Sequence, residues 1–516
     1  MNFRKPSAAR FAAWNCAKNK EGESEMRKSG MLLPIFSLPS PYGIGTFGAS
    51  AYAFVDFLAA AGQSIWQILP LGPTGFGNSP YQSDSTFAGN PLLLDLDLLI
   101  KDGLLTESEC TAFSWGNSPD TVDYDRVRAY RPLLFKTAFE RFFAAIPADY
   151  EAFCEAESGW LSDYALFRAL KDAHSGSAWQ EWEPVYRDRD EAALASFAAA
   201  NKAALDYYKM LQYLFFRQWR ALKARANAKG IDILGDLPIY VAMDSADVWS
   251  HRELFALNAE GRPTEVSGCP PDAFSEDGQK WGNPVYHWAA LKDTDYAWWK
   301  ARVHHACTLY DLVRIDHFRG FESYYCIPAE AENAKIGVWR KGPGMDLFRS
   351  LENELGALPL IAEDLGFLTP AVYELLAESG YPGMRVMQFA FADVQGDSSY
   401  LPHNFIENCI AYTGTHDNDT ILGWARTARP DEWDFAAHYL GIKTREEAPD
   451  GMLKALLASK ADTVISQAQD WLEKGSEARI NTPGTTEGNW CWRARSGDFS
   501  DEVTVKALDL TRLYRR

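Results

Sequence analysis

The chain has 516 residues, of which 51 are Lys or Arg and 70 are Asp or Glu, giving a formal net charge of −19. This length is compatible with one large domain carrying insertions or with two to three domains. The negative charge disfavours nucleic acid and anionic membranes as partners and favours a neutral substrate. Aromatic residues form 14% of the chain, and their flat rings serve either core packing or stacking on sugar faces.

The N-terminal segment and the cysteines bear on location. Residues 1–26 are rich in Arg, Lys, Ala and Ser and lack the apolar stretch of a secretory signal, so we expect a disordered extension. A transit peptide, or a start at Met26, is the alternative. Apolar runs are all shorter than a membrane span requires. The eight cysteines are scattered with no C-x-x-C pair, which predicts neither a zinc site nor a disulfide framework and favours the cytoplasm.

Eight short strand candidates alternate with helical patterns along the chain. The strand candidates cover residues 31–37, 65–70, 231–236, 312–316, 359–363, 385–390, 409–415 and 479–482. Helical patterns follow the first and the fifth of them, at 49–61 and 371–379. Alternation of this kind predicts an α/β fold, a (β/α)8 TIM barrel, formed by residues 27–90 and 230–516.

Two long segments interrupt this alternation. Residues 91–229 carry Ala, Leu, Phe and Trp at helical spacing, for example over 207–225, which predicts a mainly helical insertion subdomain. Residues 237–300 form a second insertion. Its part 267–282 contains Pro and Gly residues that disfavour long regular structure, so we expect a lid loop over the mouth of the barrel.

A glycine pattern near the N-terminus resembles a dinucleotide-binding fingerprint. Gly43-Ile-Gly45-Thr-Phe-Gly48 has the G-x-G-x-x-G spacing after a predicted strand. The next strand, 65–70, ends without the acidic residue that would hold a ribose hydroxyl. Phosphate-loop, zinc-helix and serine-elbow motifs are also missing from the sequence. We therefore expect no cofactor and no metal.

Three predicted strand ends each deliver one carboxylate. They are Asp316 in Leu-Val-Arg-Ile-Asp-His-Phe-Arg-Gly, Glu363 in Leu-Ile-Ala-Glu-Asp-Leu-Gly and Asp417 in Tyr-Thr-Gly-Thr-His-Asp-Asn-Asp. Because the ends of parallel strands meet at one face of a barrel, these acids are expected to share a site. Gathered carboxylates match glycosidic-bond chemistry, which needs a nucleophile, a proton donor and groups that stabilise positive charge. Taken singly, each acid could equally be a solvated strand end.

Several strings together resemble a known family. They are Ser-Pro-Tyr-Gly-Ile-Gly, Gly-Asn-Ser-Pro-Tyr-Gln, Gly-Asp-Leu-Pro-Ile-Tyr-Val-Ala, Trp-Gly-Asn-Pro, Arg-Ile-Asp-His-Phe-Arg-Gly, Ala-Glu-Asp-Leu-Gly and Gly-Thr-His-Asp-Asn-Asp. In this order, from about Lys28 to Arg493, the chain resembles the amylomaltase-type 4-α-glucanotransferases, or disproportionating enzymes, of glycoside hydrolase family 77. It is more distantly similar to the α-amylase clan, which implies a common barrel and mechanism.

The resemblance implies that Asp316 is the nucleophile, Glu363 the acid/base and Asp417 the stabiliser of the transition state. Arg314 lies two residues before Asp316 on the same strand, so both side chains point to the same side and can pair. Glu363 must carry a proton near neutral pH, and crowding by the other two carboxylates is expected to raise its pKa.

Other residues carry over as substrate-binding candidates. They are Tyr81, Asp236, Asp272, Trp281, Arg314, Phe389, Asp393 and His416. Asp236 is expected to brace the site, His416 to donate to a sugar hydroxyl, and Asp272 and Trp281 to meet the acceptor sugar from the lid. For Tyr81, Trp281 and Phe389, plain packing is the alternative interpretation.

The resemblance implies a retaining 4-α-glucanotransferase that disproportionates maltooligosaccharides without a cofactor. Its partners would be α-1,4-glucans and an acceptor that is glucose or a maltooligosaccharide, with no nucleic acid and no membrane. The first alternative is an α-1,4-glucan hydrolase of the same clan, an amylase or α-glucosidase. The second is a glucan-binding protein without catalysis.

Overall fold

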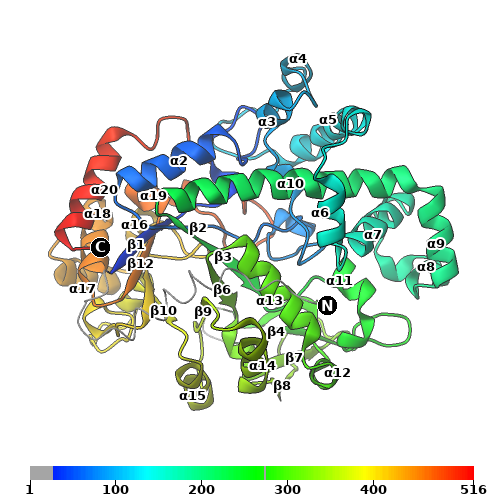
Figure 1. Cartoon of the computed structure of the whole chain (residues 1–516). Helices are drawn as coiled ribbons and strands as arrows, with labels where there is room; N and C mark the ends of the chain where they lie inside the picture. Colours follow the sequence, from blue (N-terminus) through cyan, green and yellow to red (C-terminus); the bar gives the residue numbers. More distant parts are fainter. Residues whose placement is uncertain (1–26, 272–274) are drawn as a thin grey trace.

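The computed structural model describes residues 27–271 and 275–516 (Figure 1). The predicted extension 1–26 and the candidate Asp272 lie outside these described residues.

Eight parallel strands form the central sheet and confirm the predicted (β/α)8 barrel. Their hydrogen-bonded order is β10-β11-β12-β1-β2-β3-β6-β9. The strands are β1 (Lys28–Leu32), β2 (Ile65–Gln67), β3 (Asp232–Pro238), β6 (Leu312–Asp316), β9 (Leu360–Ala362), β10 (Gly383–Val386), β11 (Cys409–Tyr412) and β12 (Thr463–Gln467). The amide of Ala362 donates to the Pro382 carbonyl at 2.9 Å, so one hydrogen bond links the two edges and nearly closes the barrel.

The first, sixth and last strands differ from those expected. The sixth, predicted at 385–390, is β10 at Gly383–Val386, and a 3-10 helix, Met387–Phe391, follows it. The first begins earlier, at Lys28, and the predicted last strand at 479–482 is wrong, because β12 pairs in parallel with both β11 and β1. Thr463-Val-Ile-Ser-Gln is entirely buried, although three of its five residues are polar. Because of these polar residues, the segment lacks the apolar run by which a buried strand is predicted from sequence. Residues 479–482 instead form a loop that runs past the strand ends.

Helices surround the sheet (Figure 1). They are α2 (Ala49–Ala60), α3 (Leu96–Lys101), α4 (Glu107–Thr111), α5 (Tyr124–Ala144), α6 (Tyr150–Ala156), α7 (Leu161–Ala173), α8 (Pro184–Arg187), α9 (Glu191–Ala200), α10 (Lys202–Ala228), α11 (Ala246–Ser250), α12 (Trp288–Asp293), α13 (Ala297–Leu309), α14 (Met345–Leu355), α15 (Pro370–Ser379), α16 (Ile421–Thr427), α17 (Pro430–Leu440), α18 (Ala448–Ala458), α19 (Ala468–Trp471) and α20 (Asp501–Leu513). The helices predicted at 49–61 and 371–379 are confirmed. Within the described part of the chain, no helix is both long and apolar enough to cross a membrane.

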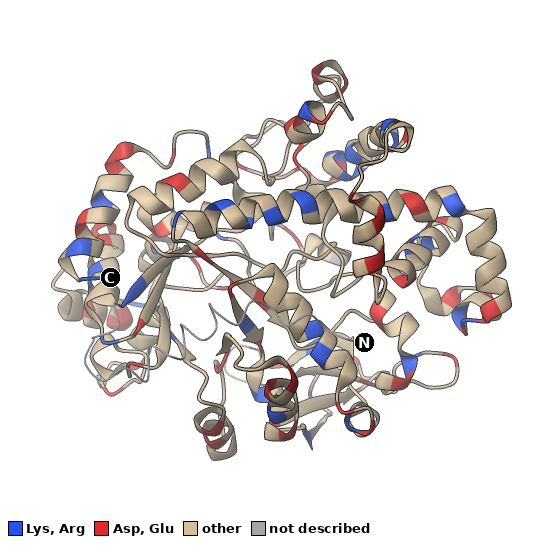
Figure 2. Ribbon diagram, viewed as in Figure 1, with Lys and Arg blue, Asp and Glu red and all other residues tan. Residues whose placement is uncertain are grey.

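The segment between β2 and β3 is helical and is held to the barrel by its last helix, α10. Figure 2 shows mainly Lys and Arg along the outer side of α10. These cations pair with acids on neighbouring elements: Arg225 meets Asp56 of α2 at 2.8 Å, and Arg220 meets Glu157 beyond α6 at 2.8 Å. The buried side of α10 packs on the barrel, where Phe215 contacts Phe47 with ring centroids 5.1 Å apart.

A second, antiparallel sheet stands beside the barrel, with strand order β5-β4-β7-β8. Its strands are β4 (Glu265–Cys269), β5 (Gln279–Pro284), β7 (Ser323–Pro328) and β8 (Val338–Lys341). The expected lid loop 267–282 is therefore largely a hairpin whose two sides are β4 and β5. Its Gly and Pro residues are not confined to the turn, because Gly268 and Gly282 lie within the strands.

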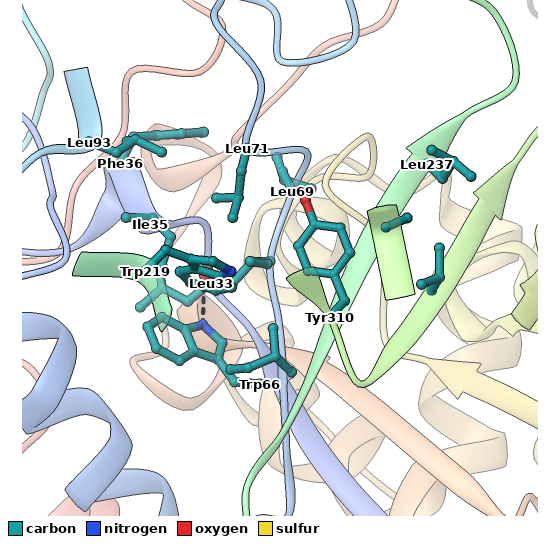
Figure 3. Packing of buried hydrophobic residues seen from close by; sticks show 14 of the residues in the cluster. Leu33, Ile35, Phe36, Trp66, Leu69, Leu71, Leu93, Trp219, Leu237 and Tyr310 are labelled. Carbon is teal, nitrogen blue, oxygen red and sulfur yellow. Dashed lines mark hydrogen bonds between the residues drawn. The ribbon is translucent and has the colours of Figure 1, made fainter. Parts of the chain in front are cut away.

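The largest hydrophobic core lies between the sheet and the helices (Figure 3). Trp66 of β2 is fully buried and donates its indole N–H to the Leu33 carbonyl at 2.8 Å. Gly235 in β3 permits another close contact, since a Cβ there would come within 2.2 Å of the Tyr310 ring. The tyrosine thus lies flat against the strand directly before Asp236. The core fixes the strand ends that carry the polar residues described next.

Candidate active site

Asp316 is the last residue of β6, and Arg314 on the same face binds it. Arg314 Nη2 lies 2.9 Å from Asp316 Oδ1, and Arg314 Nη1 donates to both oxygens of Asp236 at 2.7 and 2.9 Å. Asp236 stands opposite Arg314 in the β3–β6 register, so both side chains face the barrel interior. The side chain of Asp316 is 29% exposed, whereas that of Asp236 is completely buried. Asp316 is thus the member of this network that solvent or a substrate can reach.

Tyr81 extends the network from the loop after β2. Its hydroxyl donates to Asp236 Oδ2 at 2.7 Å, and its ring stacks on His416 at a centroid distance of 5.1 Å. Burial raises the pKa of Asp236 above its ordinary value, while Arg314 acts in the opposite direction. Asp236 accepts three hydrogen bonds in a buried site and thereby braces Arg314 and Tyr81.

Glu363 follows β9 and is held by two backbone amides. Its Oε2 accepts from the His317 N–H at 2.7 Å, and its Oε1 accepts from the Leu365 N–H at 2.8 Å. Burial is the main cause that raises the pKa of Glu363 to about 7, with a smaller contribution from the charge of Asp316 and with Arg314 opposing it. The expected cause, crowding by two carboxylates, is therefore secondary to desolvation. Glu363 is nevertheless poised to exchange a proton near neutral pH.

His317 connects the site to the antiparallel sheet. Its backbone is left-handed, with φ of 55°, and this turn directs its amide toward Glu363. Its ring meets Trp281 of β5 edge-on, with centroids 4.9 Å apart. Burial lowers the pKa of His317 to about 4, so the ring is neutral at physiological pH. Trp281 therefore lies next to the strand end that carries Asp316.

Asp417 follows β11 and is positioned by the loop after β12. Asn481 Nδ2 donates to Asp417 Oδ1 at 2.6 Å, and Arg479 Nη2 donates to the Asp417 carbonyl at 2.6 Å. His416 Nε2 lies 3.4 Å from the same Asp417 oxygen. Sequence reasoning missed Arg479 and Asn481, because it assigned both to a barrel strand. Both residues lie beyond α19, well after the end of β12 at Gln467, so a strand-end position does not mark them in the sequence.

The segment that carries His416 and Asp417 is anchored at both ends by Asp470 of α19. Asp470 accepts from the Thr413 hydroxyl at 2.6 Å and from the Ile421 N–H at 2.8 Å. Burial raises the pKa of Asp470 to about 7. A single buried carboxyl group thus holds the two ends of the loop 413–421 together.

The remaining candidates are less closely placed. Phe389 packs on the apolar cluster inside the barrel and meets Tyr400 edge-on at 5.6 Å. Asp393 is exposed, and its side chain accepts a local hydrogen bond from the Gln395 amide at 3.0 Å. This contact does not connect Asp393 to the three carboxylates. Asp272 lies outside the described residues, and no cluster of three metal-ligating side chains occurs in the parts of the chain that the structure describes.

Two carboxyl groups at the mouth of the barrel, those of Asp316 and Glu363, differ in exposure and in protonation. Asp316 is accessible and paired with a guanidinium, whereas Glu363 is buried, held by amides and able to carry a proton near pH 7. Glycosidic-bond cleavage requires one carboxyl group that carries a proton and a second that is ionised and can act as nucleophile.

Comparison with known proteins identifies the family. Residues 33–498 match the family model of glycoside hydrolase family 77, described as 4-alpha-glucanotransferase. The chain belongs to the 4-alpha-glucanotransferase family. A 4-alpha-glucanotransferase of Clostridium butyricum is 46% identical over 486 residues, which cover 93% of this chain and 99% of the relative. One from Thermus thermophilus is 48% identical over 487 residues, covering 92% of this chain and 96% of the relative.

A solved structure of a 4-alpha-glucanotransferase relative agrees with the fold. The amylomaltase of Streptococcus agalactiae, solved in complex with acarbose, is 41% identical and superposes with a TM-score of 0.93. The match covers 95% of this chain and 99% of that one. The family and the barrel expected from the sequence are thereby both confirmed.

Proposed function

We propose that this 4-alpha-glucanotransferase transfers α-1,4-glucan segments by a retaining double displacement at Asp316 and Glu363. In the first step, a carboxylate oxygen of Asp316 attacks the anomeric carbon of the donor sugar. Glu363 gives its proton to the glycosidic oxygen, and the reducing-end fragment leaves. The product is a covalent glucosyl ester on Asp316.

In the second step, Glu363 is ionised and takes the proton from the 4-hydroxyl of an acceptor. That oxygen attacks the anomeric carbon and releases Asp316, so two inversions retain the α-configuration. The acceptor is glucose or a maltooligosaccharide. Asp417, held by Asn481, is assigned to stabilise the positive charge on the sugar in both transition states.

The observation that carries this proposal is the contrast between the two carboxyl groups. Burial raises the pKa of Glu363 to about 7, which allows it to act as acid and then as base in one cycle. The salt bridge of Asp316 with Arg314 at 2.9 Å supplies a counter-charge for the attacking carboxylate and for the same carboxylate when it leaves the sugar in the second step. The family membership supports the choice of an α-glucan as substrate.

The test is incubation with maltotriose alone. Transfer gives a ladder of longer oligosaccharides together with glucose, whereas hydrolysis gives only glucose and maltose. Asp316→Asn should lose activity by several orders of magnitude while keeping its fold, because the change removes the nucleophile and little volume. No ladder from the wild type, or more than a few per cent of activity in Asp316→Asn, would contradict the proposal.

A second experiment separates the roles of the two residues. Glu363→Gln should not act on ordinary glucans but should still react with α-glucosyl fluoride, because fluoride leaves without a proton. The glucosyl ester on Asp316 should then accumulate and add the mass of one sugar to the intact protein. An unchanged mass, or a sugar attached elsewhere, would overturn the assignment.

We also propose that the protein works in the cytoplasm. The eight cysteines without paired spacing support a reducing compartment. Fractionation of cells that produce the protein should recover it with cytoplasmic markers, and recovery in an organelle or outside the cell would contradict this location.

A further inference from the structure

A groove of about 310 Å³ is lined by residues of β8 and of the loop before α15. Its size is at the lower end of the range for ligand pockets, which is roughly 300–1,000 Å³. Two aromatic residues, Trp339 and Phe367, line it together with polar groups that include Arg319 and Thr369.

The groove is continuous with the two loops that carry the proposed catalytic residues. Arg319 lies three residues after Asp316, and Phe367 lies four residues after Glu363. The loops are tied together at the groove, because Arg319 Nη1 donates to the Phe367 carbonyl at 2.6 Å. A glucan chain that extends from Asp316 and Glu363 along these loops would therefore reach the groove.

The two aromatic rings are exposed and one is held in place. Phe367 is 80% exposed and Trp339 is 42% exposed. The guanidinium of Arg319 lies over the Trp339 ring at 4.0 Å, and Tyr325 packs against the same ring at 5.2 Å. Since Trp339 is oriented by its neighbours rather than buried by them, it offers a preformed flat surface at little entropic cost to a ligand.

The polar groups of the groove suit a hydroxylated neutral ligand. Arg319 Nε is buried and has no hydrogen-bond partner among the described residues. Three cations line the groove, and two of them are paired, Lys341 with Glu322 and Arg340 with Glu265, so the lining keeps the positive charge of Arg319. Exposed aromatic faces flanked by donors and acceptors match a pyranose, which presents C–H groups on its faces and hydroxyls at its edge.

From this geometry we propose that the Trp339–Phe367 groove is an additional glucan-binding subsite, which holds a remote stretch of the α-1,4-glucan whose reacting bond lies at Asp316. The inference rests on the proposed function, because the glucan is chosen as occupant through continuity with that site. Long glucans then gain binding energy that maltotriose is too short to use.

The kinetic test compares donors of different length. Phe367→Ala and Trp339→Ala should each lower the ratio of kcat/KM for maltoheptaose over maltotriose by about tenfold through lost stacking. The exposed Phe367 side chain can be removed without disturbing the core. The matched control is Leu513→Ala on α20, which removes a side chain 68% exposed and should keep the wild-type ratio. An unchanged ratio in both groove variants would overturn the subsite.

A binding measurement separates this inference from the proposed function. Calorimetric titration of maltoheptaose into Asp316→Asn and into Asp316→Asn/Phe367→Ala should give a Kd about tenfold higher for the second protein. Equal Kd values would overturn the groove even if wild-type transfer is intact. Weaker binding combined with no wild-type transfer would keep the groove and reject the transferase. A change of oligomeric state with equal Kd would assign the groove to a protein contact instead.

Discussion

At the scale of single residues, the proposed mechanism predicts that the protonation of Glu363 sets the pH dependence of the reaction. Two amide hydrogen bonds favour its ionised form, but burial outweighs them and raises its pKa to about 7. The first step requires the protonated form, which is fully present below that pKa and is lost as the pH rises through it.

We therefore expect kcat/KM for maltotriose to fall about tenfold per pH unit above roughly pH 7. With α-glucosyl fluoride as donor, this alkaline fall should disappear, because the leaving group needs no proton. Both profiles can be measured with the wild-type enzyme between pH 5 and 9. An alkaline fall of the same size with the fluoride donor would assign it to another group.

Asn481 is predicted to act as a positioning residue for Asp417. Its amide makes a 2.6 Å hydrogen bond to Asp417 Oδ1, and without it the carboxylate can rotate away from the sugar. Asn481→Ala should lower kcat about 100-fold with a small effect on KM, as misplacement of a group near the reacting centre does. Asn481→Gln serves as the conservative control, and partial recovery is expected from it. Loss through KM alone would mean that Asn481 binds sugar directly.

At the scale of elements, the loop 413–421 depends on one buried acid. Asp470→Ala would leave the Thr413 hydroxyl and the Ile421 amide without their acceptor, which should cost about 2–4 kcal/mol of stability and lower kcat. Asp470→Asn keeps both contacts, since its amide oxygen accepts from Ile421 while its NH2 donates to Thr413. Thermal unfolding and kcat of both variants test this, and equal losses in the two would contradict it.

The β4–β5 hairpin is predicted to control the competition between water and sugar. Trp281 packs against His317, the residue after Asp316, so Trp281→Ala should remove about 1 kcal/mol of stacking on the acceptor sugar and admit water. The ratio of hydrolysis to transfer, measured as reducing ends released per glucose moved, should rise about fivefold. Trp281→Phe retains a ring and is the control. If both rates fall equally, Trp281 serves packing alone.

The elements also show where sequence reasoning succeeds and fails. Seven strands could be placed because each contains a short apolar run, and in β6 and β9 that run leads into a carboxylate. β12 was missed, since three of its five residues, Thr463, Ser466 and Gln467, are polar although they are buried. Asn481 escaped notice because it was assigned to a strand, whereas its role follows from the fold of a loop, which periodicity does not encode. The three carboxylates could be predicted because each follows closely on a short apolar run that is visible in the local sequence.

At the scale of the whole molecule, the helical segment 91–229 and the barrel share one core. Phe47 of the barrel region packs on both Phe215 and Trp219 of α10, and the Trp219 indole donates to the Leu309 carbonyl at 3.1 Å. A subdomain joined in this way is expected to unfold together with the barrel rather than before it.

Trp219→Ala should accordingly destabilise the entire protein by about 3–5 kcal/mol, since it empties a fully buried site. A single calorimetric transition shifted to lower temperature is the expected result. The control is Leu133→Ala, which removes a side chain 50% exposed on α5 and should shift the transition little. Two separate transitions, only one of them shifted, would show that the helical segment is an independent domain.

The amide of His317 joins the strand of Asp316, the proposed nucleophile, to the carboxyl group of Glu363, the proposed acid/base. Because the donor belongs to the main chain, every amino acid except proline supplies it. Point mutation of Trp281 or Phe389, the proposed sugar-binding residues, therefore leaves the link between the strand of Asp316 and Glu363 in place. Substitutions of side chains can therefore change which glucans the enzyme accepts, while the main-chain hydrogen bond that joins the two carboxylate-bearing loops is kept.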